Sequence, residues 1–518
     1  MPPSPSTPPA LLIALPHGLA ISGITTWAVR LADAFAAMGR RVTLIAHEIE
    51  GHPARAALTP ISGVEVVTVR TPRSLDEAGG DYRDSMPTYR DTLRRLFRET
   101  GRPVVVAPNL TSECYGIVAS LAAVEPELFR VAAWCHNHIE HDFQILRHFA
   151  PAIHRFVGVS RAVADQLRAR IAGREADVVY LPHGVAVPAT CPVREPLRGR
   201  AARLIYTGRI DETQKRTGAL VAMSESLAVA GIEHELMLVG DGPAAADIDR
   251  RIIGSSRVRR VASAPPSEIA RLLARADFFV MASRYEGFSI AMVEAMAQGC
   301  IPVVTRVESG AADAVEPGVT GELIEASIGD EALLGTAMAE GVRRALSAGP
   351  DRLSDGCWRR TREAFSIERH ASLCADLFDS LVSDDPRWWV GGGGRTAASQ
   401  ADGMAGFSVP AEAPARMRAA LRELAGRRVA LWGAGRHTIA VAAELATSPA
   451  SILAIIDDDP ARAGSSLLGY PIVRGAQLAG LGVTDVVISS WMHESDMWSR
   501  RGALESMNVR VHRLYVRS

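Results

Sequence analysis

The 518-residue chain lacks a long hydrophobic segment, and this absence argues against a membrane-spanning helix. The apolar run from Ala10 to Leu15 is far shorter than the roughly 18 residues that a bilayer requires, and no other charge-free apolar stretch reaches that length. The Pro- and Ser-rich start also lacks the basic residues of a signal peptide. We therefore expect a cytoplasmic protein without a transmembrane segment, and a peripheral membrane contact stays open.

Neither cysteine content nor net charge indicates a specialised class of protein. The six cysteines include no CxxC pair and no spacing typical of a secreted domain, which favours a reducing compartment over a disulfide framework. Lys and Arg total 57 against 58 for Asp and Glu, so no overall positive charge would attract the chain to nucleic acid. We expect no nucleic-acid partner, and any phosphate group must be bound locally.

Short β-branched runs alternate with longer helical patterns, which predicts an α/β protein with parallel sheets. The chain is too long for one compact domain. We predict a first Rossmann-like domain at 10–191, a second at 192–383, a Gly- and Ala-rich flexible linker at 384–425 and a small Rossmann-like domain at 426–518. The expected strands are Leu11–Leu15, Arg41–Ala46, Val104–Ala107, Val131–Cys135, Phe156–Val159, Leu204–Thr207, Leu236–Val239, Phe278–Met281 and Ile301–Thr305.

The segment from Ala276 to Val304 reads as a strand, a turn, a helix and a second strand. The amide groups of Gly287, Phe288 and Ser289 would open the helix, where anions bind. Glu286 precedes the helix and Glu294 lies two turns into it, at most about 12 Å away, which is comparable to the length of a nucleotide sugar. The alternative is that both glutamates are solvated helix residues.

Cations follow another predicted strand. Arg209 and Lys215 come just after Leu204–Thr207, where they could neutralise a diphosphate leaving group. A Gly-rich turn, Gly240 to Pro243, ends the next strand and would let backbone approach a ligand. Taken singly, these cations are more often surface ion-pair formers, and the Gly turn is more often an ordinary turn.

In this order, Arg209, Lys215, the Gly turn and the EGFSIAMVE segment resemble the retaining glycosyltransferases of the GT-B fold, the family of sucrose-phosphate synthases and bacterial mannosyltransferases. The likeness covers about residues 10 to 383 and implies two Rossmann-like domains facing a cleft. It also implies that Arg209 and Lys215 bind the donor diphosphate, that Glu294 binds the ribose and that Glu286 lies beside the transferred sugar. Such enzymes need no metal and no cofactor.

The resemblance extends to the first domain. Gly23 matches a glycine turn that faces the phosphates, although Ser22 stands where many relatives have a second glycine. His136 matches a histidine that contacts the donor sugar, with His138 as the second choice, and His183 is expected to be structural. A zinc site built from the three histidines of the WCHNHIEHDF segment with Glu140 and Asp142 has the wrong spacing for a common structural site.

The last domain carries an incomplete dinucleotide fingerprint. WGAGRHT follows a predicted strand, and Asp457 ends the next strand 22 residues after Gly435. The third glycine is absent. A second ligand site at Gly433, Gly435, His437 and Asp457 and a packing domain without ligand are both open. The region resembles small modules appended to sugar methyltransferases and acetyltransferases.

Three functions follow from these patterns. The first is a retaining, metal-independent hexosyltransferase that moves a sugar from a nucleotide diphosphate donor to a glycan, lipid or small-molecule acceptor, in polysaccharide or glycoconjugate synthesis. The second is a non-catalytic nucleotide-sugar-binding or regulatory protein, because two carboxylates and two cations suffice for binding. The third is an NAD-dependent oxidoreductase in the last domain. The intact set of site residues in the second domain favours the first function.

Overall fold

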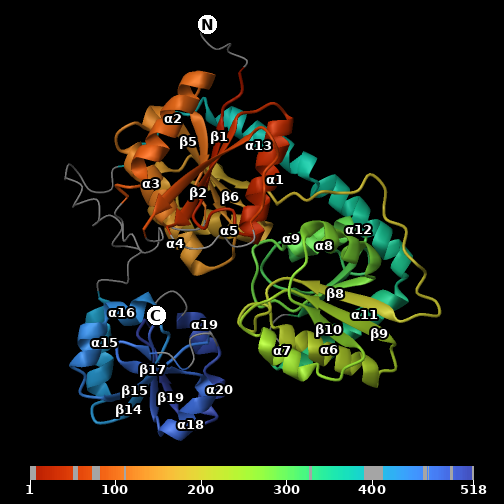
Figure 1. Cartoon of the computed structure of the whole chain (residues 1–518), viewed down its shortest axis with the longest axis vertical. Coiled ribbons are helices and arrows are strands. Elements are labelled where there is room, and N and C mark those ends of the chain that lie inside the picture. The colour runs from red at the N-terminus through yellow and green to blue at the C-terminus, as the bar shows by residue number, and fades with distance from the viewer. Residues whose placement is uncertain are drawn as a thin grey trace. The chain divides into compact units, whose positions relative to one another are not determined.

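The computed structural model describes residues 7–50, 57–72, 82–109, 112–325, 329–389, 412–458, 464, 466–490 and 494–515. The chain forms two compact units, Met1–Gly393 and Gly394–Ser518, and each is described by itself (Figure 1). The larger unit contains two lobes, each with its own parallel sheet.

The first lobe is a parallel sheet whose described strands have the order β3-β2-β1-β4-β5-β6-β7. Its central strands are buried along their whole length, as expected for a parallel sheet covered by helices on both faces. The strands are β1 (Leu11–Leu15), β2 (Val42–Ile49), β3 (Val64–Thr71), β4 (Val104–Ala107), β5 (Phe129–Cys135), β6 (Arg155–Gly158) and β7 (Val178–Tyr180). The helices are α1 (Gly23–Ala37), α2 (Met86–Thr100), α3 (Ser112–Ala122), α4 (Glu140–His148) and α5 (Arg161–Arg170).

The second lobe repeats this architecture, with the described strand order β10-β9-β8-β11-β12-β13, all parallel. The strands are β8 (Ala202–Thr207), β9 (His234–Val239), β10 (Val258–Val261), β11 (Phe278–Met281), β12 (Ile301–Arg306) and β13 (Glu322–Glu325). The helices are α6 (Thr217–Val229), α7 (Ala245–Arg251), α8 (Pro266–Arg275), α9 (Ile290–Ala297), α10 (Ala311–Ala314), α11 (Glu331–Ser347) and α12 (Pro350–Ala364). The order reverses between β8 and β11, and ligands of open α/β sheets bind at such a reversal.

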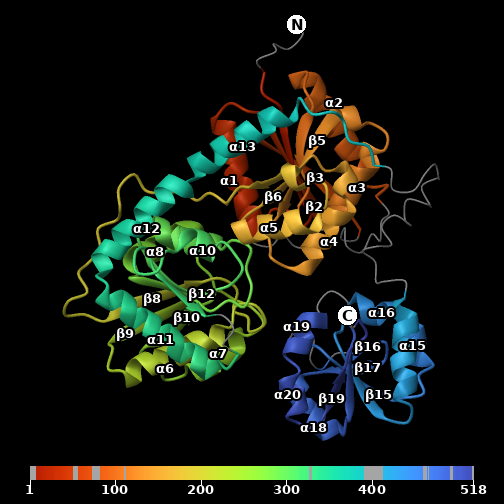
Figure 2. The same cartoon turned by 180° about the vertical axis from the view of Figure 1, so that it is seen from behind.

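The chain crosses between the lobes twice. Val185 forms a parallel bridge with Ser366 where the outgoing and returning segments run side by side. Helix α13 (Ile367–Leu381) then returns to the first lobe and packs against α1, as both views show (Figures 1 and 2). Phe35 and Phe378 meet there with ring centroids 5.5 Å apart. The two lobes therefore share one continuous apolar core.

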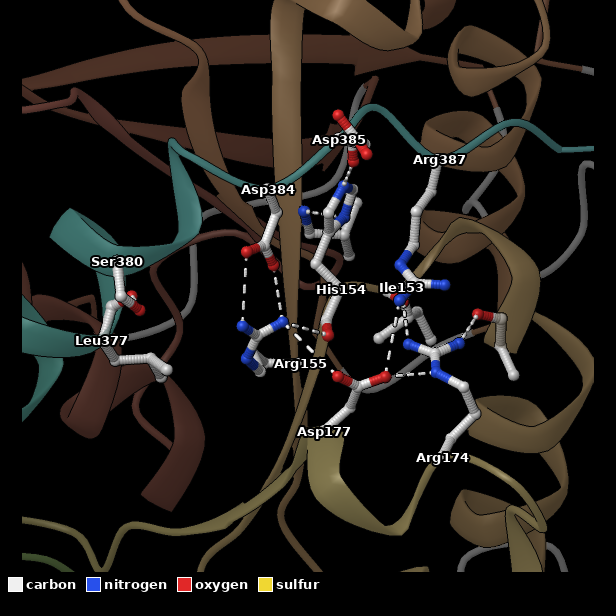
Figure 3. Close-up of polar contacts among 12 residues, drawn as sticks. Ile153, His154, Arg155, Arg174, Asp177, Leu377, Ser380, Asp384, Asp385 and Arg387 are labelled. Carbon is white, nitrogen blue, oxygen red and sulfur yellow. Dashed lines mark hydrogen bonds and ion pairs between the residues drawn. The ribbon is translucent and has the colours of Figure 1, made fainter.

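An ion-pair cluster fastens the segment after α13 to the first lobe (Figure 3). Arg155 binds Asp384 at 2.6 Å, and Asp177 contacts both Arg174 and Arg387. Trp389 then packs beside Phe149, with ring centroids 5.3 Å apart. The start of the range predicted as a flexible linker is therefore an ordered strap on the first lobe.

The C-terminal unit is an α/β domain with a mixed sheet (Figure 2). Its described strand order is β16-β17-β15-β14-β18-β19, and β16 is the antiparallel member. The strands are β14 (Arg428–Trp432), β15 (Ser451–Ile456), β16 (Ser466–Leu467), β17 (Tyr470–Val473), β18 (Asp485–Ile488) and β19 (Arg510–His512). The helices are α15 (Ala413–Glu423), α16 (Arg436–Ala440), α17 (Ala442–Ala446), α18 (Leu478–Leu481), α19 (Glu494–Ser499) and α20 (Gly502–Glu505). Buried Met417 and Leu421 tie α15 into this core, although α15 lies within the range predicted as linker.

The predicted α/β class with two Rossmann-like lobes is confirmed. The expected strands Leu11–Leu15, Val104–Ala107 and Phe278–Met281 have the bounds that the structure gives to β1, β4 and β11. Strand β3 was not predicted, because its half-exposed residues at the sheet edge produce no continuous apolar run. Residues 390–411, the remaining core of the predicted linker, lie outside the described residues.

Candidate functional site

The loops after β8 and β11 meet at the point where the order of the second sheet reverses. Lys215 forms an ion pair with Glu286, and the Ser283 hydroxyl donates to the same carboxylate oxygen of Glu286 at 2.7 Å. Both charged side chains are largely buried, with 17% and 9% of their surfaces exposed. The structure thus brings two of the predicted site residues into direct contact at the position where open α/β sheets generally bind their ligands.

The turn into α9 presents backbone amide groups at this same edge. Ser289 is the N-cap residue, and its hydroxyl accepts the N–H of Met292 at 3.3 Å. Within the part of the chain that the structure describes, the N–H groups of Gly287, Phe288 and Ser289 have no acceptor. Such a helix start can bind an anion. The Phe288 ring itself packs 5.5 Å from that of Phe365, so its predicted contribution is confined to the backbone.

Arg209 is linked to Lys215 and Glu286 by a series of polar contacts. Its side chain is 55% exposed and pairs with Asp211 at 3.0 Å, while a second contact leads to Gln214. Gln214 accepts the N–H of Arg284 at 2.7 Å through its carbonyl oxygen, and so lies beside the turn that carries Glu286. Arg209 is therefore near Lys215 and Glu286 but is the most exposed of the three.

The Gly-rich turn at Gly240 to Pro243 serves the loop that carries Arg209. Gly240 and Gly242 have φ values of +153° and +156°, and a Cβ atom at either position would overlap the carbonyl oxygen of Gly208 or Ile210. Ile210 also donates its N–H to the Asp241 carbonyl at 2.9 Å. The close backbone approach expected at this turn is made to the neighbouring loop, and it sets the position of Arg209.

Glu294 of α9 pairs with Arg30 of α1, which belongs to the other lobe. About a quarter of each side chain is exposed, 25% for Glu294 and 26% for Arg30. Arg30 was not among the residues predicted for the site from the sequence. A signal was present, since a charged residue interrupts the run of buried residues from Trp27 to Leu31 on α1.

His136 directly follows the carboxyl end of β5, and both of its ring nitrogens have hydrogen-bond partners. Its Nε2 donates to Asn109 at 2.9 Å, because the Asn109 amide nitrogen already donates to Ala14 and Ala107. Its Nδ1 faces His183 at 3.4 Å, and burial lowers the pKa of His136 to about 3. A Cβ atom on Gly287 would overlap the His136 carbonyl oxygen. The neutral imidazole and its backbone therefore adjoin the turn that opens α9.

The neighbouring histidines have different surroundings. His138 faces Glu308 of the second lobe at 3.4 Å, and burial lowers its pKa. His183 is buried between the rings of His136 and Phe288, in agreement with the expected structural role. Glu140 pairs with Arg170, and Asp142 accepts from Asn137 at 3.1 Å. Among the residues that the structure describes, no group of three His, Cys, Asp or Glu side chains is arranged to hold a metal ion.

Gly23 is the first residue of α1, and the space that a side chain would enter there is open. Ser22 occupies the N-cap position, where its hydroxyl accepts the N–H of Thr25 at 3.1 Å. The serine that replaces a second glycine therefore stabilises the helix start. Its capping is compatible with the predicted role of the Gly23 amide.

Two of the residues predicted for a second site in the C-terminal unit, His437 and Asp457, form hydrogen bonds within that unit. His437 is buried, with Nδ1 3.0 Å from Ser489 and Nε2 2.7 Å from the Tyr515 hydroxyl, and burial lowers its pKa to about 4. Asp457 accepts the N–H of Ala434 at 3.1 Å. Gly433 has a φ of +117° and lies against the Ser489 carbonyl, whereas Gly435 has no close neighbour. These contacts join the glycine turn, the acid and the histidine within the domain.

Of the helices in the described ranges, none has both the length and the apolar character needed to cross a bilayer.

Comparison with known families finds two matches within the larger unit. Residues 21–187 match Glycosyltransferase Family 4, and residues 201–347 match Glycosyl transferases group 1. The two matched ranges correspond to the first and second lobes.

The curated relatives are similar to less than half of this chain. The lipopolysaccharide 1,6-galactosyltransferase of Salmonella typhimurium is 27% identical over 236 residues, 44% of this chain and 62% of the relative. A glycogen synthase of Thioalkalivibrio sulfidiphilus is 29% identical over 238 residues, 43% of this chain and 45% of the relative. The chain therefore spans less than two thirds of the length of these relatives.

Solved structures share the fold of the larger unit. Sucrose-phosphate synthase from Thermosynechococcus elongatus has a TM-score of 0.56 at 19% identity, covering 72% of this chain and 99% of its own. An Anabaena protein in complex with UDP-glucose has a TM-score of 0.54 at 14% identity, covering 72% of this chain and 100% of its own. These similarities show a common GT-B architecture.

Proposed function

Because the first two domains of the chain belong to the glycosyltransferases of family 4 and group 1, we propose that the protein is a retaining glycosyltransferase that uses a nucleotide diphosphate sugar. The acceptor would be a glycan, a lipid-linked sugar or a small molecule, in polysaccharide or glycoconjugate synthesis. The observation that carries the proposal is the buried Lys215–Glu286 pair beside the amide groups of Gly287, Phe288 and Ser289, for which the described part of the chain supplies no acceptor.

The chemistry follows from what these groups can bind. The Lys215 ammonium has three N–H donors, so one can remain on Glu286 while others bind diphosphate oxygens. The amide groups at the start of α9 would bind the same diphosphate, and Arg209 would close over it from its exposed position. These donors would stabilise the charge that develops as the bond from the sugar to the phosphate breaks.

Glu286 and Glu294 would bind the two ends of the donor. Glu286, next to Lys215, would accept hydrogen bonds from the transferred sugar, and Glu294, farther along α9, would accept those of the ribose. His136 would lie beside the bound donor, because its backbone adjoins Gly287. Burial lowers its pKa to about 3, so it would meet the donor sugar as a neutral ring rather than as a cation. The leaving phosphate oxygen would then help to remove the acceptor proton.

The relatives support a nucleotide sugar as the donor. The Anabaena structure contains UDP-glucose, and a relative from Mycobacterium tuberculosis is named a GDP-mannose-dependent mannosyltransferase. We expect this chain to use one of these donor classes without a metal ion or a cofactor. A non-catalytic binder would carry the same groups, and turnover separates the two functions.

The test measures binding and transfer separately. Thermal unfolding would be followed with UDP- and GDP-sugars for the full chain and for a chain that ends at Gly393, so that the strap stays in place. Both chains should gain stability from the same donor. NMR of the product should show the donor's anomeric configuration retained. Stabilisation without any turnover, even donor hydrolysis, would favour the binding protein, and no stabilisation by any donor would contradict the proposal.

A further inference from the structure

The ion pair between Arg30 and Glu294 joins the two lobes at the carboxylate that we assign to the donor ribose. Arg30 lies on α1 and Glu294 on α9, so the contact bridges helices that belong to different sheets. Each side chain is about three-quarters buried, which shields the pair from solvent and strengthens it relative to an exposed one.

Helix α1 presents Arg30 from a well-anchored position. Trp27 donates its indole N–H to His370 at 2.9 Å, and Arg40 forms two parallel bonds to Asp379, of 2.8 and 2.6 Å. Both partners lie on α13. Because these contacts hold α1 one turn before Arg30 and hold the chain just beyond the end of the helix, the guanidinium can fix the geometry of its partner rather than follow it.

The hydrogen-bond capacity of Glu294 leaves room for a ligand. A carboxylate offers about four lone-pair sites on its two oxygens. Arg30 uses Oε1, and Oε2 has no donor among the residues that the structure describes. Two hydroxyl groups on neighbouring carbons, as in the 2′ and 3′ positions of a ribose, could both donate to the sites that remain.

We propose that Arg30 is a positioning residue that orients Glu294 toward the 2′- and 3′-hydroxyl groups of the donor ribose, so that recognition of the ribose depends on a side chain from the opposite lobe. The inference rests on the proposed use of a nucleotide sugar. Arg30 touches Glu294 and acts through it. Its loss should weaken donor binding more than it slows the chemical step.

The experiment compares R30A with R40A, since each removes one arginine ion pair and only Arg30 contacts Glu294. Arg30 lies on α1, and Arg40 lies just beyond the end of that helix. For R30A the KM for the donor should rise roughly tenfold while kcat changes by less than about threefold, because a charge-assisted hydrogen bond is lost in ground state and transition state alike. R40A should retain the wild-type KM. R30K should recover part of the loss.

A second readout reports on the ribose directly. Wild-type protein should bind UDP or GDP more tightly than the corresponding 2′-deoxy nucleotide, and calorimetry should show this preference shrinking severalfold in R30A and in E294A. The double variant should be no worse than E294A, because the two residues act as one unit.

The outcomes separate the two proposals. If wild type binds neither nucleotide, the proposed function fails and this inference fails with it. If wild type binds and R30A keeps both its KM and its preference for ribose, only the role of Arg30 is overturned. Equal effects of R30A and R40A, or additive losses in the double variant, would also overturn it, because they would indicate general loosening of α1.

Discussion

The turn after β11 and the turn after β14 follow buried parallel strands beside a reversal of strand order, yet their polar groups are used differently. In the second lobe, Lys215 and Glu286 meet beside amide groups of α9 for which the described residues supply no acceptor. In the C-terminal unit, His437 and Asp457 are bonded to Ser489 and Ala434. Polar groups satisfied from within a domain stabilise it, whereas donors left open at a sheet edge can bind a ligand.

The largest expected effect is on transfer, from the second lobe. K215A should lower kcat/KM for the donor by roughly 10²- to 10³-fold, because a cation on the leaving diphosphate is lost and Glu286 is left without its cationic partner. Steady-state assays would measure the change. R343A, which removes a surface ion pair with Glu340, is the control and should behave as wild type. Near-normal turnover in K215A would contradict the assignment of this site. It would also contradict the proposed difference between the second lobe and the C-terminal unit.

Acid should weaken the larger unit more than the C-terminal one. In the larger unit, burial lowers the pKa of His47 and His370 to about 4 and the pKa of His136 and His154 to about 3. In the described part of the C-terminal unit, burial lowers the pKa of His437 to about 4. These groups stay neutral in the folded state, so the unfolded chain binds protons first as the pH falls below about 6.5. Stability is therefore lost from there toward pH 3 to 4.

Each such histidine should contribute about 1–2 kcal/mol of this loss between pH 7 and pH 5. Asp142 opposes the trend, because burial raises its pKa to about 7 and acid then favours the folded state. Hydrogen exchange followed by mass spectrometry would resolve the units. Earlier opening of the C-terminal unit on acidification would reverse the predicted order.

His437 tests the other half of the comparison. H437A should destabilise the C-terminal unit by about 2–4 kcal/mol, since it removes two buried hydrogen bonds and leaves a cavity. Transfer should stay within about twofold of wild type if the larger unit alone carries the reaction. Urea unfolding and donor assays on the same preparation would decide. A large loss of transfer would show that the C-terminal unit has a ligand of its own or acts on the active lobes.

A smaller effect is expected at the strap. D384N should cost roughly 1 kcal/mol, because the partly exposed pair with Arg155 loses its charge while a hydrogen bond remains. The donor KM should not change. A double-mutant cycle with R155M, read by denaturant unfolding, would isolate the pair. Zero coupling energy would mean that the backbone contacts of residues 384 to 389, rather than this ion pair, hold the strap.

The smallest expected effect is that of chelation. Treatment with EDTA should leave donor turnover and the stability of both units unchanged, because the proposed reaction relies on Lys215, Arg209 and the α9 amides for charge neutralisation. Activity that is lost and then restored by one divalent ion would show that a metal takes over that task.

Much of the fold could be predicted from the sequence. Buried parallel strands are continuous apolar runs, so β1, β4 and β11 were predicted with correct bounds, and helix caps such as Ser160 and Ser366 carry a local signal. Strands at sheet edges, such as β3, lack such runs. The strap after α13 could not be predicted either. It lies next to a Gly-rich sequence that is typical of a linker, and its contacts are made with residues more than 200 positions away, as in Arg155–Asp384.

For the site, local sequence determined which groups follow which strands: the amides at the start of α9 after β11, and Arg209 with Lys215 after β8. Spacing along one chain cannot specify a partner on another element, because side-chain contacts depend on how sheets and helices pack. Only the tertiary structure therefore decided that Lys215 meets Glu286, that His136 adjoins Gly287, and that Arg30 reaches Glu294 from the opposite lobe.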